Sequence, residues 1–285
     1  MLNDWIHEIL VNGIMDRVEG LFDTISDRVY WITGYVAQTP TDWNPAVFNM
    51  IEGIATSVLR PIAGIMLAII LAIDLIQMIT EKNHMIEFEV ATLIKWIVKA
   101  YIGIFLIDNT FGILLAAFEL AQDAISGMGA IALQPLVNPA TLSGLEESLE
   151  GMEILTLIGL FLQLFLVEFL SWIMEIVIIV VIIGRFFEIF IAMSVGPLPL
   201  VTMINRDWSS MGQNYLKTMI ALAFQGFLIV ICVSIYSALV GDFITEIESH
   251  DSVMGSLWMV LAFTVLLIFS IFKTGAVSKS IFGAH

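Results

Sequence analysis

The sequence predicts an all-α membrane protein with about five transmembrane helices, and three observations lead to this class. Of its 285 residues, 59% are hydrophobic. Only 13% are charged, whereas ordinary soluble domains carry about a quarter. Several apolar runs also come close to the roughly 20 residues that a helix needs to cross a bilayer. Together these features exclude an ordinary soluble globular protein.

The apolar runs are the candidate transmembrane helices. Four are clearly separate: 58–79, 94–118, 216–239 and 253–272. The fifth, 154–193, contains no proline and no polar cluster. We therefore expect one continuous helix of about 40 residues, roughly 60 Å long, that forms either one span or two.

The distribution of charge predicts how these helices cross the membrane, because Lys and Arg accumulate in short inner loops. Segments 120–153 and 240–252 contain acidic residues but no Lys or Arg, so we expect them outside. The segments expected inside carry the basic residues Lys82, Lys95, Lys99, Arg206, Lys217, Lys273 and Lys279. An outer segment before 154–193 and an inner one after it require a single crossing. The sequence thus predicts a multi-pass membrane protein with five spans, its N-terminus outside and its C-terminus inside.

Residues 1–52 are predicted to form amphipathic helices that precede a single five-span domain, 53–285. Apolar side chains recur there at three-and-four spacing, with acidic residues and arginines between them. Such a stripe lies in the headgroup layer or against partner helices, or it packs on the protein's own spans. Asn44 and Pro45 resemble an N-cap and first-turn proline of the helix that becomes the first span. Ser143 and Glu146 have the spacing of a capping box, which would start the long helix outside the membrane.

Four ionisable residues inside the long run are the candidate functional residues: Glu168, Glu175, Arg185 and Glu188. No window of about 20 residues avoids all of them, so at least one lies at membrane depth, where it should face protein or water. For Glu168 and Glu175 we weigh an interhelical contact or aqueous path against a solvated outer half of the helix. Arg185 and Glu188 are spaced to pair. Alternatively, Arg185 extends to the inner surface and Glu188 sits beside it in the interface. Asp74 and Asp108 pose the same ambiguity.

The long run ends at a sequence that breaks helices, Gly196, Pro197, Leu198 and Pro199. Neither proline can donate to a helical ladder, and each disfavours helical geometry in the residue before it. A polar stretch with Trp208 follows, and this residue type suits the membrane interface. On the first span, Gly64, Ala68 and Ala72 form a row of small residues, which allows close helix packing.

This break also carries a family resemblance. A long apolar helix that runs into "AMSVGPLPLV" and then "NRDWSSMGQNYLKTMIALAF" resembles the TrbL-like conjugal transfer proteins, polytopic inner-membrane subunits of type IV secretion systems. The matching motif residues are Gly196, Pro197, Leu198 and Trp208. The N-terminal "LNDWIHEILVNGIMDRVEGLF" is similar to versions from conjugative elements of Gram-positive bacteria. The family's five-span topology agrees with the charge distribution.

The resemblance implies a channel or platform subunit that helps relaxase-bound single-stranded DNA and protein cross the cytoplasmic membrane. It implies a homo-oligomeric ring, with other type IV secretion subunits, including ATPases, and membrane lipids as partners. The net charge of −16 leaves few Lys and Arg for phosphates, so DNA is expected only as a passing substrate. A solute or ion transporter, or a membrane scaffold without its own path, are the alternatives. We expect no enzymatic activity, metal or cofactor, because catalytic motifs are lacking and Cys232 is the single cysteine.

Overall fold

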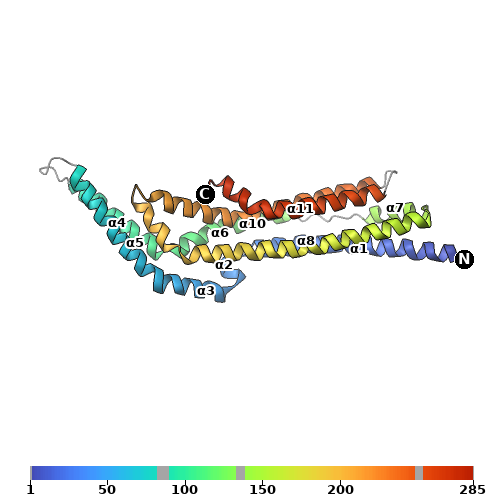
Figure 1. Cartoon of the computed structure of the whole chain (residues 1–285), viewed down its shortest axis with the longest axis horizontal. Helices are drawn as coiled ribbons and strands as arrows, with labels where there is room; N and C mark the ends of the chain where they lie inside the picture. The colour runs from blue at the N-terminus through green and yellow to red at the C-terminus, as the bar shows by residue number, and fades with distance from the viewer. Residues whose placement is uncertain (1, 82–89, 133–138, 248–252, 285) are drawn as a thin grey trace. The chain divides into compact units, whose positions relative to one another are not determined.

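The computed structural model describes residues 2–81, 90–132, 139–247 and 253–284, and within these ranges it contains helices and turns but no strand (Figure 1). A π-helical turn, Ala55–Leu59, joins the third helix to the fourth, and a 3-10 turn, Thr202–Ile204, follows the ninth. The α-helices are α1 (Leu2–Val36), α2 (Pro40–Trp43), α3 (Pro45–Ile54), α4 (Arg60–Glu81), α5 (Val90–Asp108), α6 (Thr110–Ala132), α7 (Pro139–Glu150), α8 (Ile154–Ser194), α9 (Pro197–Val201), α10 (Ser209–Ile247) and α11 (Val253–Ile281).

The predicted fold class is confirmed. Five helical stretches of the described chain are long and apolar enough to cross a membrane: Pro45–Thr80, Thr110–Met128, Ile154–Ser194, Ser209–Gly241 and Leu257–Ile281. The protein is therefore an all-α polytopic membrane protein. The run 154–193 forms a single helix of 41 residues, as its composition predicted. Whether α8 crosses once, and which end of the chain lies inside, stay predictions from charge.

The prediction of one continuous span over 94–118 is wrong. The run divides at Asn109, between α5 and α6, and the candidate span of this region is Thr110–Met128. Asn109 Nδ2 donates to the Phe105 carbonyl at 2.9 Å, and Thr110 Oγ1 donates to the Leu106 carbonyl at 2.9 Å. Short polar side chains that bond to the preceding turn compete with the helical ladder and favour such interruptions.

Two further boundaries differ from the sequence-based expectation. The long helix does not start at Ser143. Residues 139–150 form the separate helix α7, which ends before a turn at Gly151, and α8 begins at Ile154. The predicted outer loop 240–252 is partly helical, because α10 continues to Ile247. Lys82 and residues 248–252 of that loop lie outside the described residues.

The chain groups into two compact units, which we describe separately. Unit 1 comprises Met1–Ala37, Ala124–Ile183 and Gly226–Thr274, and unit 2 comprises Gln38–Asp123, Gly184–Gln225 and Gly275–His285. These units are groups of mutual contacts and do not test the predicted division into 1–52 and 53–285.

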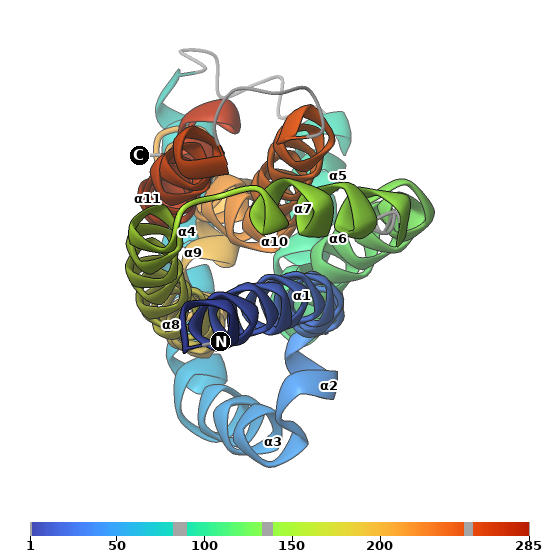
Figure 2. The same ribbon diagram turned by 90° about the vertical axis from the view of Figure 1, so that its right-hand side faces the viewer.

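In unit 1, α1 packs on the protein's own helices. It contacts α7 and runs alongside the first part of α8 (Figures 1 and 2). Its buried side chains recur at helical spacing and are Val11, Ile14, Val18, Leu21, Ile32 and Val36. Of the two interpretations of the N-terminal stripe, the structure therefore favours packing on the chain itself over a free surface helix.

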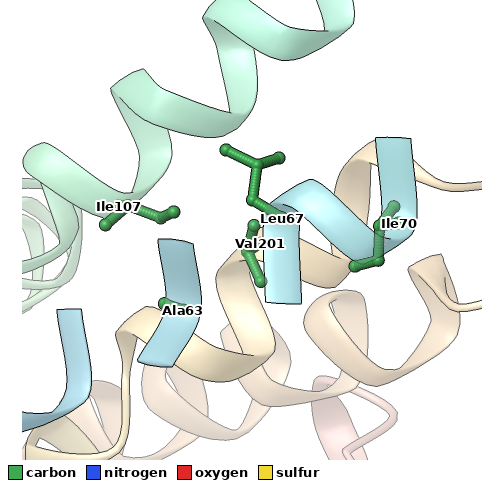
Figure 3. Packing of buried hydrophobic residues seen from close by; sticks show 5 residues of the cluster. All are labelled: Ala63, Leu67, Ile70, Ile107 and Val201. Atoms are coloured by element: carbon green, nitrogen blue, oxygen red, sulfur yellow. The ribbon is translucent and has the colours of Figure 1, made fainter. Parts of the chain in front are cut away.

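In unit 2, α4, α5 and α9 share a core. Its buried residues are Ala63, Leu67, Ile70, Ile107 and Val201, which lie together in Figure 3. Asn44 caps α3 as predicted, because its side chain accepts from the Val47 amide at 3.0 Å and Pro45 takes the first helical position. The helix then continues through the π turn into α4.

The predicted row of small residues on α4 does not pack against the residues that the structure describes. Gly64, Ala68 and Ala72 are all exposed, and a Cβ atom at Gly64 would meet nothing within 4 Å. The close approach in this region is instead at Gly103 of α5, where a Cβ atom would overlap the Leu67 side chain. Among the described residues of unit 2, the row on α4 is therefore left without a packing partner.

Candidate functional site

The break after α8 is the best-defined candidate site, and it lies within unit 2. The helix ends at Ser194, and Pro197 takes the first position of the short helix α9. The prolines therefore do more than stop α8, because they also begin the next helix. A proline is tolerated at this position because its missing N–H has no helical partner there.

The hydrogen bonds of the last turn of α8 are redistributed at this break. The Gly196 amide donates to the Met193 carbonyl at 3.1 Å. Regular α geometry would have sent that amide to Ala192. The Ala192 carbonyl instead accepts from the Tyr215 hydroxyl of α10 at 2.9 Å. Tyr215 thus satisfies a carbonyl that the break releases, and it ties the end of α8 to α10.

Gly196 is required by close packing rather than by backbone strain. A Cβ atom there would lie 2.8 Å from Thr110 Cγ2 and 2.9 Å from the Tyr215 hydroxyl oxygen. These distances are shorter than ordinary contacts between such atoms. The break, the start of α6 and α10 therefore meet at a point that admits no side chain.

The polar stretch after the break is anchored to α4 and α5. Asn205 is only 4% exposed, and its Nδ2 donates to Asp74 Oδ1 of α4 at 3.0 Å. Asp74 is 7% exposed and also accepts from Lys99 of α5. Asn205 Oδ1 accepts from the Asp207 amide at 2.9 Å. The sequence left the role of Asp74 open, and the structure shows it at the centre of a buried polar contact among three segments.

Arg185 is held inside unit 2. Its side chain is 3% exposed, and its Nε and Nη2 donate to the carbonyls of Leu222 and Ala223 in α10 at 2.9 and 3.1 Å. The guanidinium lies over the Phe186 ring, 5.4 Å from its centre, and Trp43 of α2 stacks on that ring at 4.5 Å. The interpretation in which Arg185 extends to the membrane surface is therefore wrong, because the folded chain offers it buried acceptors.

Neighbouring contacts strengthen the same region. Ser278 of α11 donates to the Ala221 carbonyl at 2.6 Å, so three successive carbonyls of α10 receive side-chain donors from other helices. Glu188 is exposed and accepts from Lys279 of α11 at 3.4 Å. An exposed pair of this kind contributes little to stability. The buried hydrogen bonds of Arg185 and Ser278 therefore hold α10 more firmly than this exposed pair does.

Glu168 and Glu175 belong to unit 1, where both lie against α1. Glu168 accepts from Arg17 at 2.5 Å, and the Arg17 guanidinium also lies 4.6 Å from the centre of the Phe161 ring. Both members of the ion pair are about one-third exposed. Glu175 lines a cavity of about 260 Å³ together with Ile178 and three residues of α1, which are Asp27, Trp31 and Ile32. The sequence offered no signal for Arg17 as the partner of Glu168.

The four candidate residues of α8 thus divide between the two units. Trp208, after the break, is exposed. Cys232 is half-buried, and the described part of the chain contains no group of three or more His, Cys, Asp or Glu residues placed to hold a metal ion. The described residues thus form polar contacts between helices, through hydrogen bonds and ion pairs, rather than a set of reactive side chains.

The sequence was compared with models of known protein families. The sequence profile of the TrbL/VirB6 plasmid conjugal transfer like proteins matches residues 25–197, from the second half of α1 to the start of α9. The match covers more than half of the chain and ends within the break. No curated protein and no solved structure matches the chain.

Proposed function

We propose, from the premise that this chain belongs to the TrbL/VirB6 plasmid conjugal transfer like family, that it is a platform or channel subunit through which substrate crosses the cytoplasmic membrane. Membership of the family makes the protein a conjugal transfer subunit of a type IV secretion system. The proposed substrate is relaxase-bound single-stranded DNA together with protein. The family match, which covers all of the long α8 and ends within the break after it, is the observation that carries the proposal.

The arrangement of ionisable groups supports a role in assembly and passage rather than in DNA binding. Arg185 is engaged by backbone carbonyls of α10, and Lys99 by Asp74. A chain with a net charge of −16 has little capacity to neutralise phosphates. DNA is therefore proposed as a passing substrate that the protein does not hold.

The proposed partners follow from the same premise. Copies of the chain form a ring around the path, with the exposed small residues Gly64, Ala68 and Ala72 of α4 as a candidate contact face. The ATPases of the apparatus act on the inner side, to which charge assigns the C-terminus, and lipids cover the remaining apolar surface. We propose that the ionisable residues of the candidate site hold helices together through hydrogen bonds and ion pairs and take no part in catalysis.

A transfer assay tests this function. The gene is deleted from its conjugative element, and mating frequency is measured with wild-type or variant protein supplied in trans. We expect transfer to be lost on deletion and restored by the wild type. The double variant Glu168→Gln with Glu175→Gln should reduce transfer at least tenfold while its level in the membrane stays normal. Glu188→Gln is the matched control, because its pair with Lys279 is exposed.

Each part of the proposed function has an outcome that would contradict it. Transfer that persists without the gene would overturn the proposed function. Wild-type transfer by the double variant would remove Glu168 and Glu175 from the path and return them to the solvated-helix interpretation. Native mass spectrometry of the protein, extracted with lipid, reports the number of copies. A stable monomer would contradict the ring.

A further inference from the structure

An open groove of about 620 Å³ runs between α8 and α11 in unit 1. Its lining is apolar and includes Leu166 and Leu170 of α8 and Trp258, Ala262, Val265 and Phe269 of α11. Trp258 and Phe269 are both more than half exposed, so the groove is open to the surroundings of the protein. It is far larger than the water-sized voids found inside proteins, and an occupant from outside would give its lining the dispersion contacts that it lacks.

The level of the groove in the membrane follows from the sequence of α11. Residues 253–272 contain no ionisable side chain, and Lys273 comes directly after them. At 1.5 Å per residue this run is about 30 Å long, which equals the thickness of the hydrocarbon core. Because an ionisable group inside the core is costly, the run fits the core with Lys273 at one boundary. The groove lies inside this run, and a register shifted anywhere within the candidate span Leu257–Ile281 would still keep its part from Ala262 to Phe269 in the core.

The composition of the lining favours a lipid chain over another helix as the occupant. Helices that associate inside membranes approach one another through small residues, because large apolar side chains gain little by leaving lipid. Among the described residues that line the groove, Ala262 alone is small, whereas Leu, Trp and Phe side chains form most of the surface. A flexible acyl chain can follow the gaps between such side chains and make dispersion contacts with them.

Lys273 continues the face of α11 that lines the groove. Trp258, Ala262, Phe269 and Lys273 follow one another at intervals of four, seven and four residues, and this spacing places them along one side of the helix. Lys273 is exposed and lies about 6 Å along the helix beyond Phe269. Charge assigns this end of α11 to the inner side of the membrane, where anionic lipids are concentrated. The Lys273 ammonium therefore lies at the level of the headgroups and complements a phosphate there.

We infer that the groove between α8 and α11 binds an acyl chain of an anionic phospholipid whose headgroup lies against Lys273. The apolar lining takes the chain, and the lysine favours the anionic headgroup. One lysine near an anionic headgroup is worth about a fivefold gain in affinity. The inference assigns a defined site to one lipid and does not depend on the proposed role in conjugal transfer.

Lipid binding to the purified protein tests the inference. The protein is stripped of lipid in detergent, and native mass spectrometry records bound lipid as phosphatidylglycerol or phosphatidylcholine with identical chains is added. We expect the wild type to bind one phosphatidylglycerol about fivefold more tightly than phosphatidylcholine, because only phosphatidylglycerol carries a net negative charge. Lys273→Gln should remove this difference. Lys279→Gln is the matched control, because Lys279 lies on the same helix but pairs with Glu188.

A second set of variants tests the groove itself. Ala262→Trp should fill the groove and weaken the binding of both lipids at least tenfold. Ala116→Trp is the matched control, because Ala116 is exposed on a different candidate span, Thr110–Met128. If Ala262→Trp lowers the melting temperature, Val265→Trp takes its place, because Val265 also lines the groove.

Several outcomes overturn the inference. Equal affinity of the wild type for the two lipids, or selectivity retained by Lys273→Gln, removes the headgroup site. Unchanged lipid binding by a folded groove-filling variant removes the chain site. A groove-filling variant that lowers the subunit number in native mass spectrometry means that a second copy of the chain occupies the groove instead of a lipid. Mating frequency is no part of these readouts, so failure of the lipid site and failure of the proposed function are distinguishable.

Discussion

The Tyr215 hydroxyl of α10 lies 2.9 Å from the Ala192 carbonyl oxygen of α8 and donates a hydrogen bond to it. This contact satisfies the acceptor that α8 loses where it ends before the two prolines. A helix end that packs against another helix needs such a donor, because its last carbonyls have no partner within the helix. The break therefore ends α8 and also attaches the end of α8 to α10.

Loss of this hydroxyl should weaken the joint. We expect Tyr215→Phe to lower the free energy of unfolding by about 1–2 kcal/mol, because a partly buried carbonyl loses its donor. Thermal unfolding in lipid nanodiscs measures the change. Tyr101→Phe is the control, because Tyr101 is exposed. Equal melting temperatures for the two variants would show that the Ala192 carbonyl finds another donor.

The contributions of Asp74 and Asn205 to stability should be coupled. Asp74→Asn removes the charge that faces Lys99, and Asn205→Ala removes the donor to Asp74. Each change should destabilise the protein, and the effects should be non-additive by about 0.5–3 kcal/mol because the two groups share one contact. A double-mutant cycle of unfolding free energies measures this coupling. Strict additivity would mean that the segment after the break is held by apolar packing alone.

Arg185 should tolerate loss of charge better than replacement by Lys. Met removes the hydrogen bonds and the buried charge together, whereas the Lys ammonium keeps the charge but lacks the planar guanidinium that reaches both carbonyls of α10. We expect the order of stability to be wild type, then Arg185→Met, then Arg185→Lys. Thermal unfolding in nanodiscs gives the order, and a Lys variant more stable than Met would contradict it.

These residues also show how far the sequence alone could lead. Composition and run length predicted the all-α class and the single long helix, because both depend on local properties. The N-cap at Asn44 was predictable for the same reason. Arg17 and Glu168 are 151 positions apart, so no local pattern could pair them. The partners of Arg185 are backbone carbonyls, which every residue carries and which therefore leave no mark in the sequence.

Two further features, the break at Asn109 and the exposure of the small residues on α4, could not be predicted from the sequence for a similar reason. The break at Asn109 depends on two side chains that bond to the preceding turn, and the apolar run around them hid this competition. The row of small residues on α4 predicted close packing but not its partner. The structure leaves that row exposed and places the tight contacts at Gly103 and Gly196 instead.

Gly64 and Gly196 should therefore respond differently to added side chains. A Cβ atom at Gly196 would lie 2.8 Å from Thr110 Cγ2, so Gly196→Ala should cost about 1–3 kcal/mol, with partial rescue by Thr110→Ser, which removes that methyl group. At Gly64 a Cβ atom meets nothing within 4 Å, so Gly64→Leu should leave the melting temperature of the monomer unchanged. If the α4 row joins copies in a ring, Gly64→Leu should instead lower the subunit number in native mass spectrometry. An unchanged ring would exclude this face from the contact, and a destabilised monomer would mean that the chain itself packs there.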